Sequence, residues 1–237
     1  LIKRFLKKNQ TIGVIAIDPS SPFSGGALLG DRVRMNHYNN DKSVFIRSMG
    51  SHGNLGGLAR KTQEAGDILA ASGKDIIIFE TVGVGQGEYD IAKAADITVL
   101  VLVPESGDEI QLMKAGLVEI ADLFVINKSD REGSGRLADS LNSMINAMGN
   151  NSKPDASVYT TVASNGKGMD KLFDGVFDHL DKLDRCGLLV QKKKERYRNR
   201  VKKLIQEQLL VEFWTEDRLR KLEDATKSLD TITESPY

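Results

Sequence analysis

The stretch LFVINKSD at residues 123–130 decides the fold expected for this chain. Its four apolar residues predict a buried strand, and NKSD follows at the carboxyl end of that strand. There the Asp130 carboxylate can accept hydrogen bonds from N1–H and the exocyclic C2 amine of guanine, whereas adenine has an acceptor at N1 and no amine at C2. A site built on such pairs rejects the unpaired analogue by roughly 10⁴-fold. We predict a guanine-nucleotide site in which Asn127 ties neighbouring loops together and the Lys128 stem covers the base. A polar turn is the alternative.

Two upstream segments share the pattern of an apolar run that ends in an acid. TIGVIAID ends in Asp18, and DIIIFE ends in Glu80 before the glycine-rich TVGVGQGE. Ligands of open parallel α/β sheets bind beyond the carboxyl ends of the strands, so we expect Asp18, Glu80 and Asn127 at one crevice. Carboxylates there suit Mg²⁺, and Gly83 would let the backbone approach a γ-phosphate. A helix N-cap is the simpler interpretation of each acid taken singly.

The remaining apolar runs alternate in a way that predicts an α/β fold with a mostly parallel sheet. VLVLV at residues 99–103 is continuous and β-branched, as expected for a strand covered on both faces. We expect strands at 11–18, 43–47, 75–80, 97–103, 123–127 and 157–162. We expect helices at 54–73, 88–94, 108–120, 134–149 and 168–183.

Composition narrows the class of protein. The 237 residues carry 33 basic and 33 acidic side chains, so the formal net charge is zero and gives no general attraction to nucleic acid or membrane. The single cysteine, Cys186, cannot form an internal disulfide and suits a reducing, cytoplasmic location. No apolar run of about 18 residues is present, so we expect no membrane span. Cys186 and the three histidines lie far apart in the sequence, so they predict no tetrahedral metal site.

Five motifs together resemble the MeaB/ArgK family of P-loop GTPases, which are associated with methylmalonyl-CoA mutase and were long labelled transport ATPases or kinases. They are DPSS at 18–21, GGALLGDRVRM at 25–35, LGGL at 55–58, ETVGVGQ at 80–86 and NKSD at 127–130. The resemblance covers roughly residues 11–170, and its longer motifs are highly specific. It implies a sheet of the P-loop NTPase type flanked by helices, with GTP or GDP and Mg²⁺ as ligands.

The resemblance also implies roles for individual residues. Asp18, Asp31 and Glu80 would serve Mg²⁺ and the hydrolytic water, and Gln86 would orient that water. Arg32, Arg34 and Arg47 have charge that suits phosphate, although surface pairing is the simpler use of each.

Two loops carry further roles by resemblance. The loop beginning at residue 104 would be a switch that communicates with the mutase, through Asp108, Glu109, Gln111 and Lys114. An ordinary helix start, with its acids near the N-terminus, is compatible with that role. Val162, Ala163 and Ser164 occupy the place of the guanine-contacting loop. Because Val162 replaces the usual serine, we expect mainly backbone contact to the base.

One family feature is absent from these 237 residues, namely the phosphate-binding motif G-x-x-x-x-G-K-[ST]. In P-loop proteins this loop cradles the phosphates, and its Lys and Ser/Thr contact phosphate and Mg²⁺. IKRFLKK at residues 2–8 resembles the end of the helix that follows the loop. We therefore expect a chain truncated at its amino terminus, without the first strand and the P-loop. Natural loss of the phosphate cradle is the alternative.

The composition changes after residue 186, so we expect a GTPase domain at 1–186 and a helical extension at 187–237. Apolar residues recur at helical spacing behind the basic run at 192–200, which predicts a long amphipathic helix with a basic face. A solvated face is the simplest interpretation of that run, and RNA or lipid binding is an alternative. The family's carboxyl-terminal helices form a homodimer, which implies that Phe213 and Trp214 are buried anchors. Residues 224–237 are expected to be frayed.

Two classes of function follow from the resemblance. The first is a GTPase that gates cofactor loading and protection of an adenosylcobalamin-dependent acyl-CoA mutase, with cobalamin bound to the mutase. The second is a non-catalytic dimeric module that binds the mutase without turnover. A transport ATPase or kinase, as the family was once labelled, is a third hypothesis, but the sequence carries no transport feature.

Overall fold

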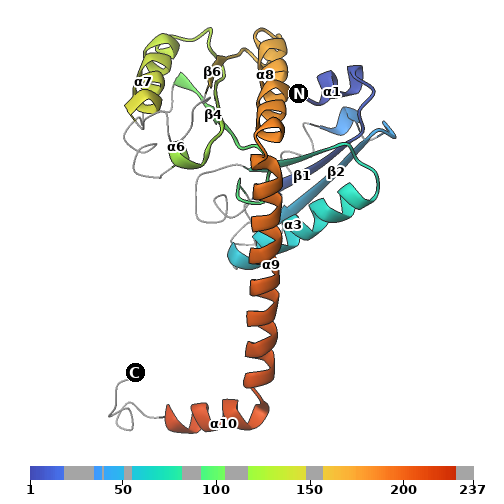
Figure 1. Ribbon diagram of the computed structural model, residues 1–237, viewed down its shortest axis with the longest axis vertical. Helices are drawn as coiled ribbons and strands as arrows, with labels where there is room; N and C mark the ends of the chain where they lie inside the picture. Colours follow the sequence, from blue (N-terminus) through green and yellow to red (C-terminus); the bar gives the residue numbers. More distant parts are fainter. Residues whose placement is uncertain are drawn as a thin grey trace. The chain divides into compact units, whose positions relative to one another are not determined.

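A computed structural model of the chain describes residues 1–18, 35–38, 40–50, 55–81, 92–104, 117–147 and 157–227 (Figure 1). The strands are β1 Ile12–Asp18, β2 Val44–Gly50, β3 Ile76–Thr81, β4 Val99–Leu102, β5 Leu123–Ile126 and β6 Ser157–Thr160. The helices are α1 Ile2–Lys7, η1 Asn36–Tyr38, α3 Leu55–Ala71, α6 Leu117–Ile120, α7 Ser134–Ala147, α8 Met169–Arg185, α9 Leu188–Phe213 and α10 Glu216–Ala225. The chain divides into two compact units, Leu1–Leu189 and Val190–Tyr237.

The predicted strands are all present, and their ends differ from the prediction by at most three residues. The largest difference is in β2, which continues to Gly50 because it pairs with β1 as far as Asp18. Of the helix predicted at 108–120, the described part is α6, and most of the segment at 88–94 lies outside the described residues. Residues 224 and 225, which were predicted to be frayed, are the last two residues of α10.

The strands form two parallel three-stranded sheets, in the orders β2-β1-β3 and β4-β5-β6. In the first sheet, Ile12 of β1 lies between Val44 and Ile76. In the second, Leu123 of β5 lies opposite Ser157 of β6. Since all strands within each sheet run in the same direction, their carboxyl ends share one edge, as the sequence predicts for a ligand-binding α/β sheet.

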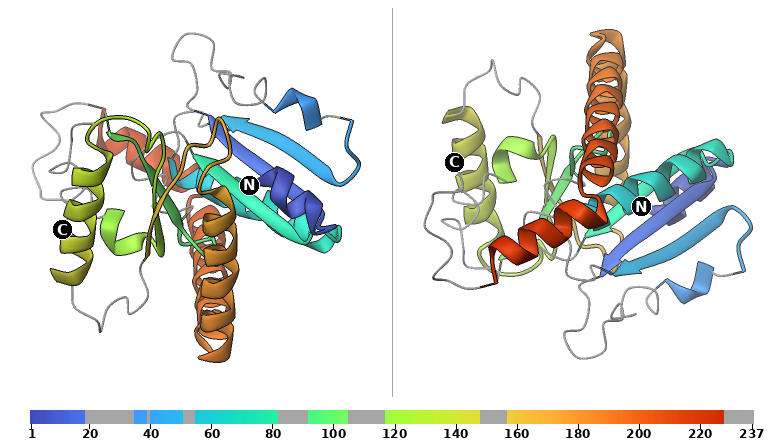
Figure 2. Two further views of the ribbon diagram at one scale, coloured as in Figure 1. Left: turned by 90° about the horizontal axis from the view of Figure 1, so that it is seen from above. Right: turned by 90° about the horizontal axis from the view of Figure 1, so that it is seen from below.

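Helices cover both faces of β2-β1-β3. On one face, Phe5 of α1 and Phe173 of α8 pack with Ile12 and Val14, and the two phenyl rings meet edge to face with centroids 5.1 Å apart. On the other face, Leu69 of α3 packs against β1. Figure 2 shows this layering, with α1 in front of the sheet from above and α3 in front of it from below. A parallel sheet needs such cover because both of its faces are apolar.

Helix α8 also covers one face of β4-β5-β6, where Met169 packs against Val125. The opposite face is covered by α6 and α7, with Leu137 and Leu141 packed against Phe124. Because α8 contributes side chains to the cores of both sheets, it joins them within the first unit. This arrangement confirms an α/β fold with parallel sheets flanked by helices.

In each of the two sheets, the middle strand is more deeply buried than one of the outer strands. The middle strands β1 and β5 are almost fully buried. The equally apolar strand β3 is only half buried along its length, and Val101 of β4 is 58% exposed. Within the described residues β3 pairs only with β1, and β4 only with β5. Each sheet therefore has one outer strand whose sequence suits an interior position.

The second unit is an angled pair of helices that sequence analysis predicted only in part. Thr215 caps α10 by accepting the Arg218 N–H at 3.4 Å, and Glu216 and Asp217 stand in its first turn, where acids favour a helix start. Arg218 also donates to the Phe213 carbonyl at 2.7 Å and stacks 4.5 Å from the centre of its ring. These contacts fix the bend between α9 and α10, which the sequence pattern did not indicate.

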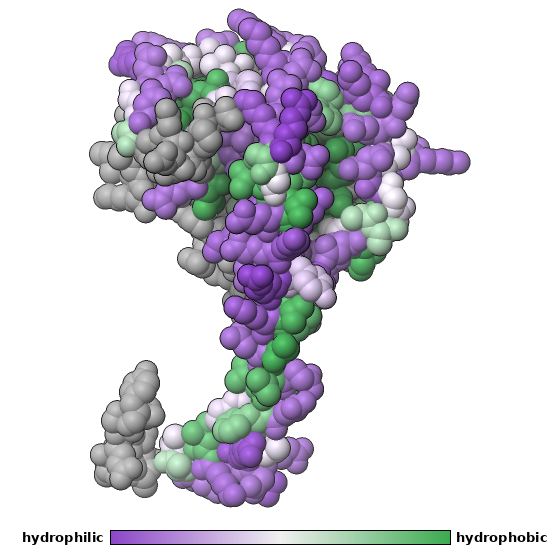
Figure 3. Space-filling model, viewed as in Figure 1, coloured by the Kyte–Doolittle hydropathy of each residue, from purple (hydrophilic) through white to green (hydrophobic). Residues whose placement is uncertain are grey.

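Helices α9 and α10 contain no buried residue. Their exposed large apolar side chains are Leu188, Val190, Tyr197, Val201, Leu204, Ile205, Leu209, Leu210, Val211, Phe213, Leu219 and Leu222. Figure 3 shows apolar surface gathered on the carboxyl-terminal part of α9 and on α10. Of the helices described, none is both long and apolar enough to cross a membrane.

Candidate guanine-nucleotide site

Asn127 connects the two loops in which base recognition was predicted. Its N–H donates to the Leu102 carbonyl at 2.8 Å, which extends the pairing of β5 with β4 by one residue. Its side-chain oxygen accepts the Ala163 N–H at 3.0 Å and the Thr161 hydroxyl at 3.2 Å. One amide oxygen thus connects the loop after β6 to the end of β5.

The backbone of NKSD is held in a tight turn. Lys128 has φ of 55°, a left-handed conformation that is uncommon for a side chain of this size. The next N–H, of Ser129, donates to the Thr161 carbonyl at 3.0 Å, and the Ser134 hydroxyl donates to the Ser129 carbonyl at 3.0 Å. Backbone outliers of this kind persist where surrounding contacts enforce them, often at ligand sites. The turn leaves the Asp130 side chain exposed, where a base can reach it.

The loop after β6 is closed by its own backbone. Val162 is buried, and its N–H donates to the Lys167 carbonyl at 2.9 Å, whereas Ala163 and Ser164 are exposed. The predicted backbone contact from Val162 to the base therefore competes with a bond inside the loop. Gly168 is the N-cap residue before α8 and has φ of 76°, and a Cβ at this position would overlap the Thr160 carbonyl. Only glycine fits there without a shift of the backbone.

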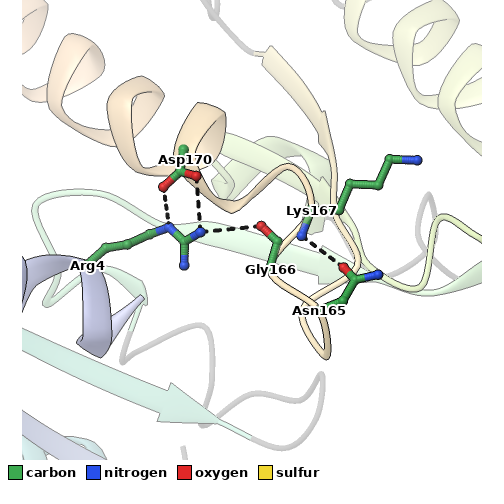
Figure 4. Close-up of polar contacts among 5 residues, drawn as sticks. All are labelled: Arg4, Asn165, Gly166, Lys167 and Asp170. Atoms are coloured by element: carbon green, nitrogen blue, oxygen red, sulfur yellow. Dashed lines mark hydrogen bonds and ion pairs between the residues drawn. The ribbon is translucent and has the colours of Figure 1, made fainter.

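Arg4 of α1 holds the far side of this loop (Figure 4). Its guanidinium donates two hydrogen bonds to Asp170, from Nε to Oδ1 at 2.6 Å and from Nη2 to Oδ2 at 3.2 Å. Nη2 also donates to the Gly166 carbonyl at 3.3 Å. The hydrogen bond to Asp170 raises the pKa of Arg4, and the same bond from Arg4 lowers the pKa of Asp170. A residue near the amino terminus thus contacts the predicted base-reading loop.

In the sheet β2-β1-β3, two acidic residues lie at or near the carboxyl ends of strands. Asp18 is the last residue of β1, and Glu80 lies one residue from the end of the neighbouring β3. The Oε2 atom of Glu80 is inaccessible to solvent. Carboxylate oxygens are the hard ligands that Mg²⁺ prefers, so acidic residues at these strand ends are of the type that the metal prediction requires. No group of three or more His, Cys, Asp or Glu within the described ranges is arranged to hold a metal ion.

Several predicted site residues lie outside the described residues. They are Asp31, Gly83, Gln86, Asp108, Glu109, Gln111 and Lys114. Their predicted roles in metal binding, water orientation and coupling to a partner remain predictions.

Three residues of this region were missed by sequence analysis. Thr161 is almost fully buried and joins Asn127, Gly168 permits the start of α8, and Arg4 holds the loop from outside. The NGKG sequence at 165–168 contains a turn signal from which Gly168 was predictable. Arg4 had no such signal, because its partner Asp170 lies 166 residues away in the chain.

Comparison with known proteins identifies relatives along most of the chain. The sequence profile of the family described as "Methylmalonyl Co-A mutase-associated GTPase MeaB" matches residues 1–218. A protein of Pyrococcus abyssi is 48% identical over 208 residues, which are 86% of this chain and 64% of the relative. The "Methylmalonic aciduria type A homolog, mitochondrial" of Mus musculus is 35% identical over 223 residues, 92% of this chain and 54% of that protein. "GTPase ArgK" of Escherichia coli is 33% identical over 209 residues, covering 86% and 63%.

This chain spans less than two thirds of the length of these three relatives. Among solved structures, "Crystal structure of LAO/AO transport system kinase" matches 99% of this chain and 70% of that chain with a TM-score of 0.65. At 24% identity this likeness concerns the fold alone, and it agrees with a sheet of the P-loop NTPase type flanked by helices. The family match over residues 1–218 and the three relatives show that the chain belongs to the MeaB family of methylmalonyl-CoA mutase-associated GTPases.

Proposed function

We propose that this chain is the guanine-nucleotide-binding part of a GTPase that acts on an adenosylcobalamin-dependent acyl-CoA mutase. The observation that carries the proposal is the hydrogen-bonded joint at Asn127, which holds NKSD against the loop containing Ala163 and leaves the Asp130 carboxylate exposed. A carboxylate carried on a turn that is held in this way would select guanine by accepting from two of its donors. Family membership supports GTP and GDP as the ligands.

Phosphate chemistry is proposed for the edge of β2-β1-β3. Asp18, Asp31 and Glu80 would hold Mg²⁺, whose charge offsets that of the phosphates, and the backbone at Gly83 would approach the γ-phosphate. Gln86 would orient the attacking water. In phosphoryl transfer the protein contributes mainly positioning and electrostatic stabilisation, so these residues need only be placed correctly.

We propose that residues 1–186 form a GTPase domain that takes its phosphate-binding strand and loop from polypeptide other than these 237 residues. The outer strands of the two sheets support this proposal. Apolar β3 and β4 each pair on one side only within the described residues, and α8 packs on both of their sheets. One additional parallel strand between β3 and β4 would bury Val101 and provide the start of a loop near Asp18 and Glu80.

The partner is proposed from the family description, which names methylmalonyl-CoA mutase. The nucleotide state would be transmitted through Asp108, Glu109, Gln111 and Lys114, and would gate loading and protection of the cobalamin cofactor on the mutase. The mutase, not this chain, would bind cobalamin. We propose a cytoplasmic location, which suits a chain with the single cysteine Cys186.

We further propose that residues 187–237 form a homodimer contact. The exposed apolar side chains of α9 and α10 support it, because contiguous apolar patches on a protein surface mark interaction sites. Phe213 is 52% exposed and Trp214 is 40% exposed, so both are free to enter such a contact. Sedimentation of Leu209→Glu should show monomers where the parent chain dimerises. Lys203→Glu on the same helix is the matched control and should leave the dimer intact.

A second candidate is a non-catalytic dimeric module for the mutase, and the absence of G-x-x-x-x-G-K-[ST] from the 237 residues favours it. Phosphate release from GTP distinguishes the two functions. We would compare the chain as given with a longer version that has a family strand and phosphate-binding loop fused ahead of Leu1. The GTPase proposal expects Mg²⁺-dependent hydrolysis of GTP only in the longer version. Absence of hydrolysis in a folded longer version, with the mutase added, would support the non-catalytic module.

A further inference from the structure

The loop after β6 is held at two points by side chains from other elements. Asn127 holds its beginning through the Ala163 N–H at 3.0 Å. Arg4 holds its far turn through the Gly166 carbonyl at 3.3 Å and grips Asp170 in the first turn of α8. The first contact belongs to the NKSD motif, whereas the second comes from α1, which no motif includes.

The geometry of the loop explains why a second point is needed. Val162 and Lys167 form an isolated β-bridge, and the chain between them turns through Gly166, whose φ is 82°. A glycine at such a position has wide conformational freedom, so the turn is easily deformed unless another group fixes it. Arg4 fixes the carbonyl of this glycine directly, with a donor whose orientation is set by the bidentate grip on Asp170.

The chemistry of arginine suits this task. The planar guanidinium presents several N–H donors in a rigid fork, so one side chain can serve a carboxylate and a carbonyl together. A lysine ammonium lacks the planar fork and cannot reproduce the paired geometry. The Arg4 side chain is only 21% exposed while that of Asp170 is 83% exposed, so the arginine is the enclosed member of the pair.

We propose that Arg4 is a positioning residue of the guanine site, which fixes the loop at 162–168 and thereby the groups that meet the base. This inference rests on the proposed function for its guanine part. It also makes α1 a mechanical link, because any displacement of α1 would be transmitted to the base-reading loop through a single side chain.

The first test measures amide hydrogen exchange in the nucleotide-free chain. The reporting amides are those of Val162, Asn165, Gly166 and Lys167, which have hydrogen-bond acceptors inside the loop. We expect exchange there to be roughly tenfold faster in Arg4→Met, as for a local opening that becomes easier. Arg4→Lys should lie between the two. Unchanged exchange in a folded Arg4→Met protein overturns the proposal.

The matched control removes an arginine–aspartate pair that lies away from the loop at 162–168. Arg185 and Asp181 form an exposed pair at 3.3 Å within α8. Arg185→Met removes an arginine–aspartate pair without touching the loop, so its exchange pattern at 162–168 should equal that of the parent chain. Loosening by both variants alike would mean that loss of any such pair acts globally, which also overturns the proposal.

The guanine part has its own measurement. Amide shifts on titration with GTP should give an affinity about fivefold to tenfold weaker in Arg4→Met, because a loosened loop must be ordered again on binding. If the loop loosens but GTP affinity is unchanged, the positioning role in guanine binding is wrong. If the parent chain shows no response to GTP, the proposed function fails, while the exchange comparison still decides whether Arg4 fixes the loop.

Discussion

The two parallel sheets have the same number of strands, and among the described residues β4-β5-β6 has side-chain hydrogen bonds between the carboxyl ends of its strands. In β4-β5-β6, Asn127 after the middle strand is bonded to Thr161 and Ala163 after the neighbouring strand. In the described part of β2-β1-β3, Thr11 and Asp75 form a clasp of hydrogen bonds between the amino ends of β1 and β3. In the proposed function, base recognition would rest on the loops of β4-β5-β6. The proposed phosphate site needs groups beyond the sheet that carries Asp18.

The largest expected effect is on the selectivity for guanine at the NKSD loop. In a longer version with a phosphate-binding loop, Asp130→Asn should abolish the preference for GTP over ATP, a loss of roughly 10⁴-fold in the ratio of affinities. Titration calorimetry with both nucleotides measures this ratio. Glu132→Gln, which removes an exposed acid two residues away, should leave it unchanged. A wild-type ratio in Asp130→Asn would contradict the role of the carboxylate.

The next effect concerns the helix that joins the two sheets. Gly175 of α8 is buried, and a Cβ there would overlap the ring of Tyr159 in β6. Gly175→Ala should therefore lower the free energy of unfolding by about 1–3 kcal/mol, the usual consequence of overpacking. Urea denaturation measures the change.

A matched glycine exists in α7. A Cβ at Gly135 would meet nothing within 4 Å, so Gly135→Ala should raise stability by about 0.5–1 kcal/mol through higher helix propensity. Equal destabilisation by the two alanines would show that close approach of α8 to β6 is not what the glycine provides.

A smaller effect separates fixing the loops from contacting the base. Asn127→Ala removes the acceptor of the Ala163 N–H and the Thr161 hydroxyl, so we expect the free energy of unfolding to fall by about 1–2 kcal/mol. Ser143→Ala, which removes an exposed hydroxyl bonded to a helix carbonyl, should change stability little. Thermal and urea unfolding check both variants. Loss of stability in Ser143→Ala but not in Asn127→Ala would contradict the tying role.

The smallest effect tests the clasp in β2-β1-β3. Hydrogen bonds from the backbone N–H and hydroxyl of Thr11 lower the pKa of Asp75. A lowered folded-state pKa stabilises the protein above the unfolded value of about 3.9, and this contribution disappears as pH falls through the folded value. Stability of Asp75→Asn should therefore decline less between pH 5 and acidic pH than that of the parent chain, by urea denaturation at a series of pH values.

Thr11→Val sharpens this test because it removes the hydroxyl donor and keeps the N–H. Its pH dependence should lie between those of the parent chain and Asp75→Asn. A parent slope in Asp75→Asn would mean that the clasp contributes no pH-dependent stability.

The sequence predicted the strands and the NKSD loop because both are local patterns. Apolar runs such as LFVI at 123–126 identify strands by composition, and the prediction of guanine binding depends on the four consecutive residues of NKSD. Contacts between distant segments had no local signal, as for Arg4 with Asp170 and Thr161 with Asn127. Within the described residues β3 and β4 each pair on one side only. The run VLVL at 99–102 did not indicate this for β4, because a continuous apolar run predicts an interior strand.

Helix α10 shows a second limit of sequence analysis. Its apolar residues are few and exposed, so periodicity gave little reason to expect it. The start signal was present in Thr215 followed by Glu216 and Asp217, a cap with acids in the first turn. Attention to helix caps would have predicted α10, whereas its bend relative to α9 depends on Arg218 and the Phe213 carbonyl.

The most direct test of the central claim is to map where GTP and ATP touch this chain. Titration of the ¹⁵N-labelled chain with each nucleotide and Mg²⁺ detects even millimolar binding through amide shifts. The account predicts that GTP shifts the amides at 127–131 and 161–168, and that ATP at the same concentration does not. Equal shifts with ATP, or GTP shifts confined to residues elsewhere, would contradict guanine recognition by the loops of β4-β5-β6.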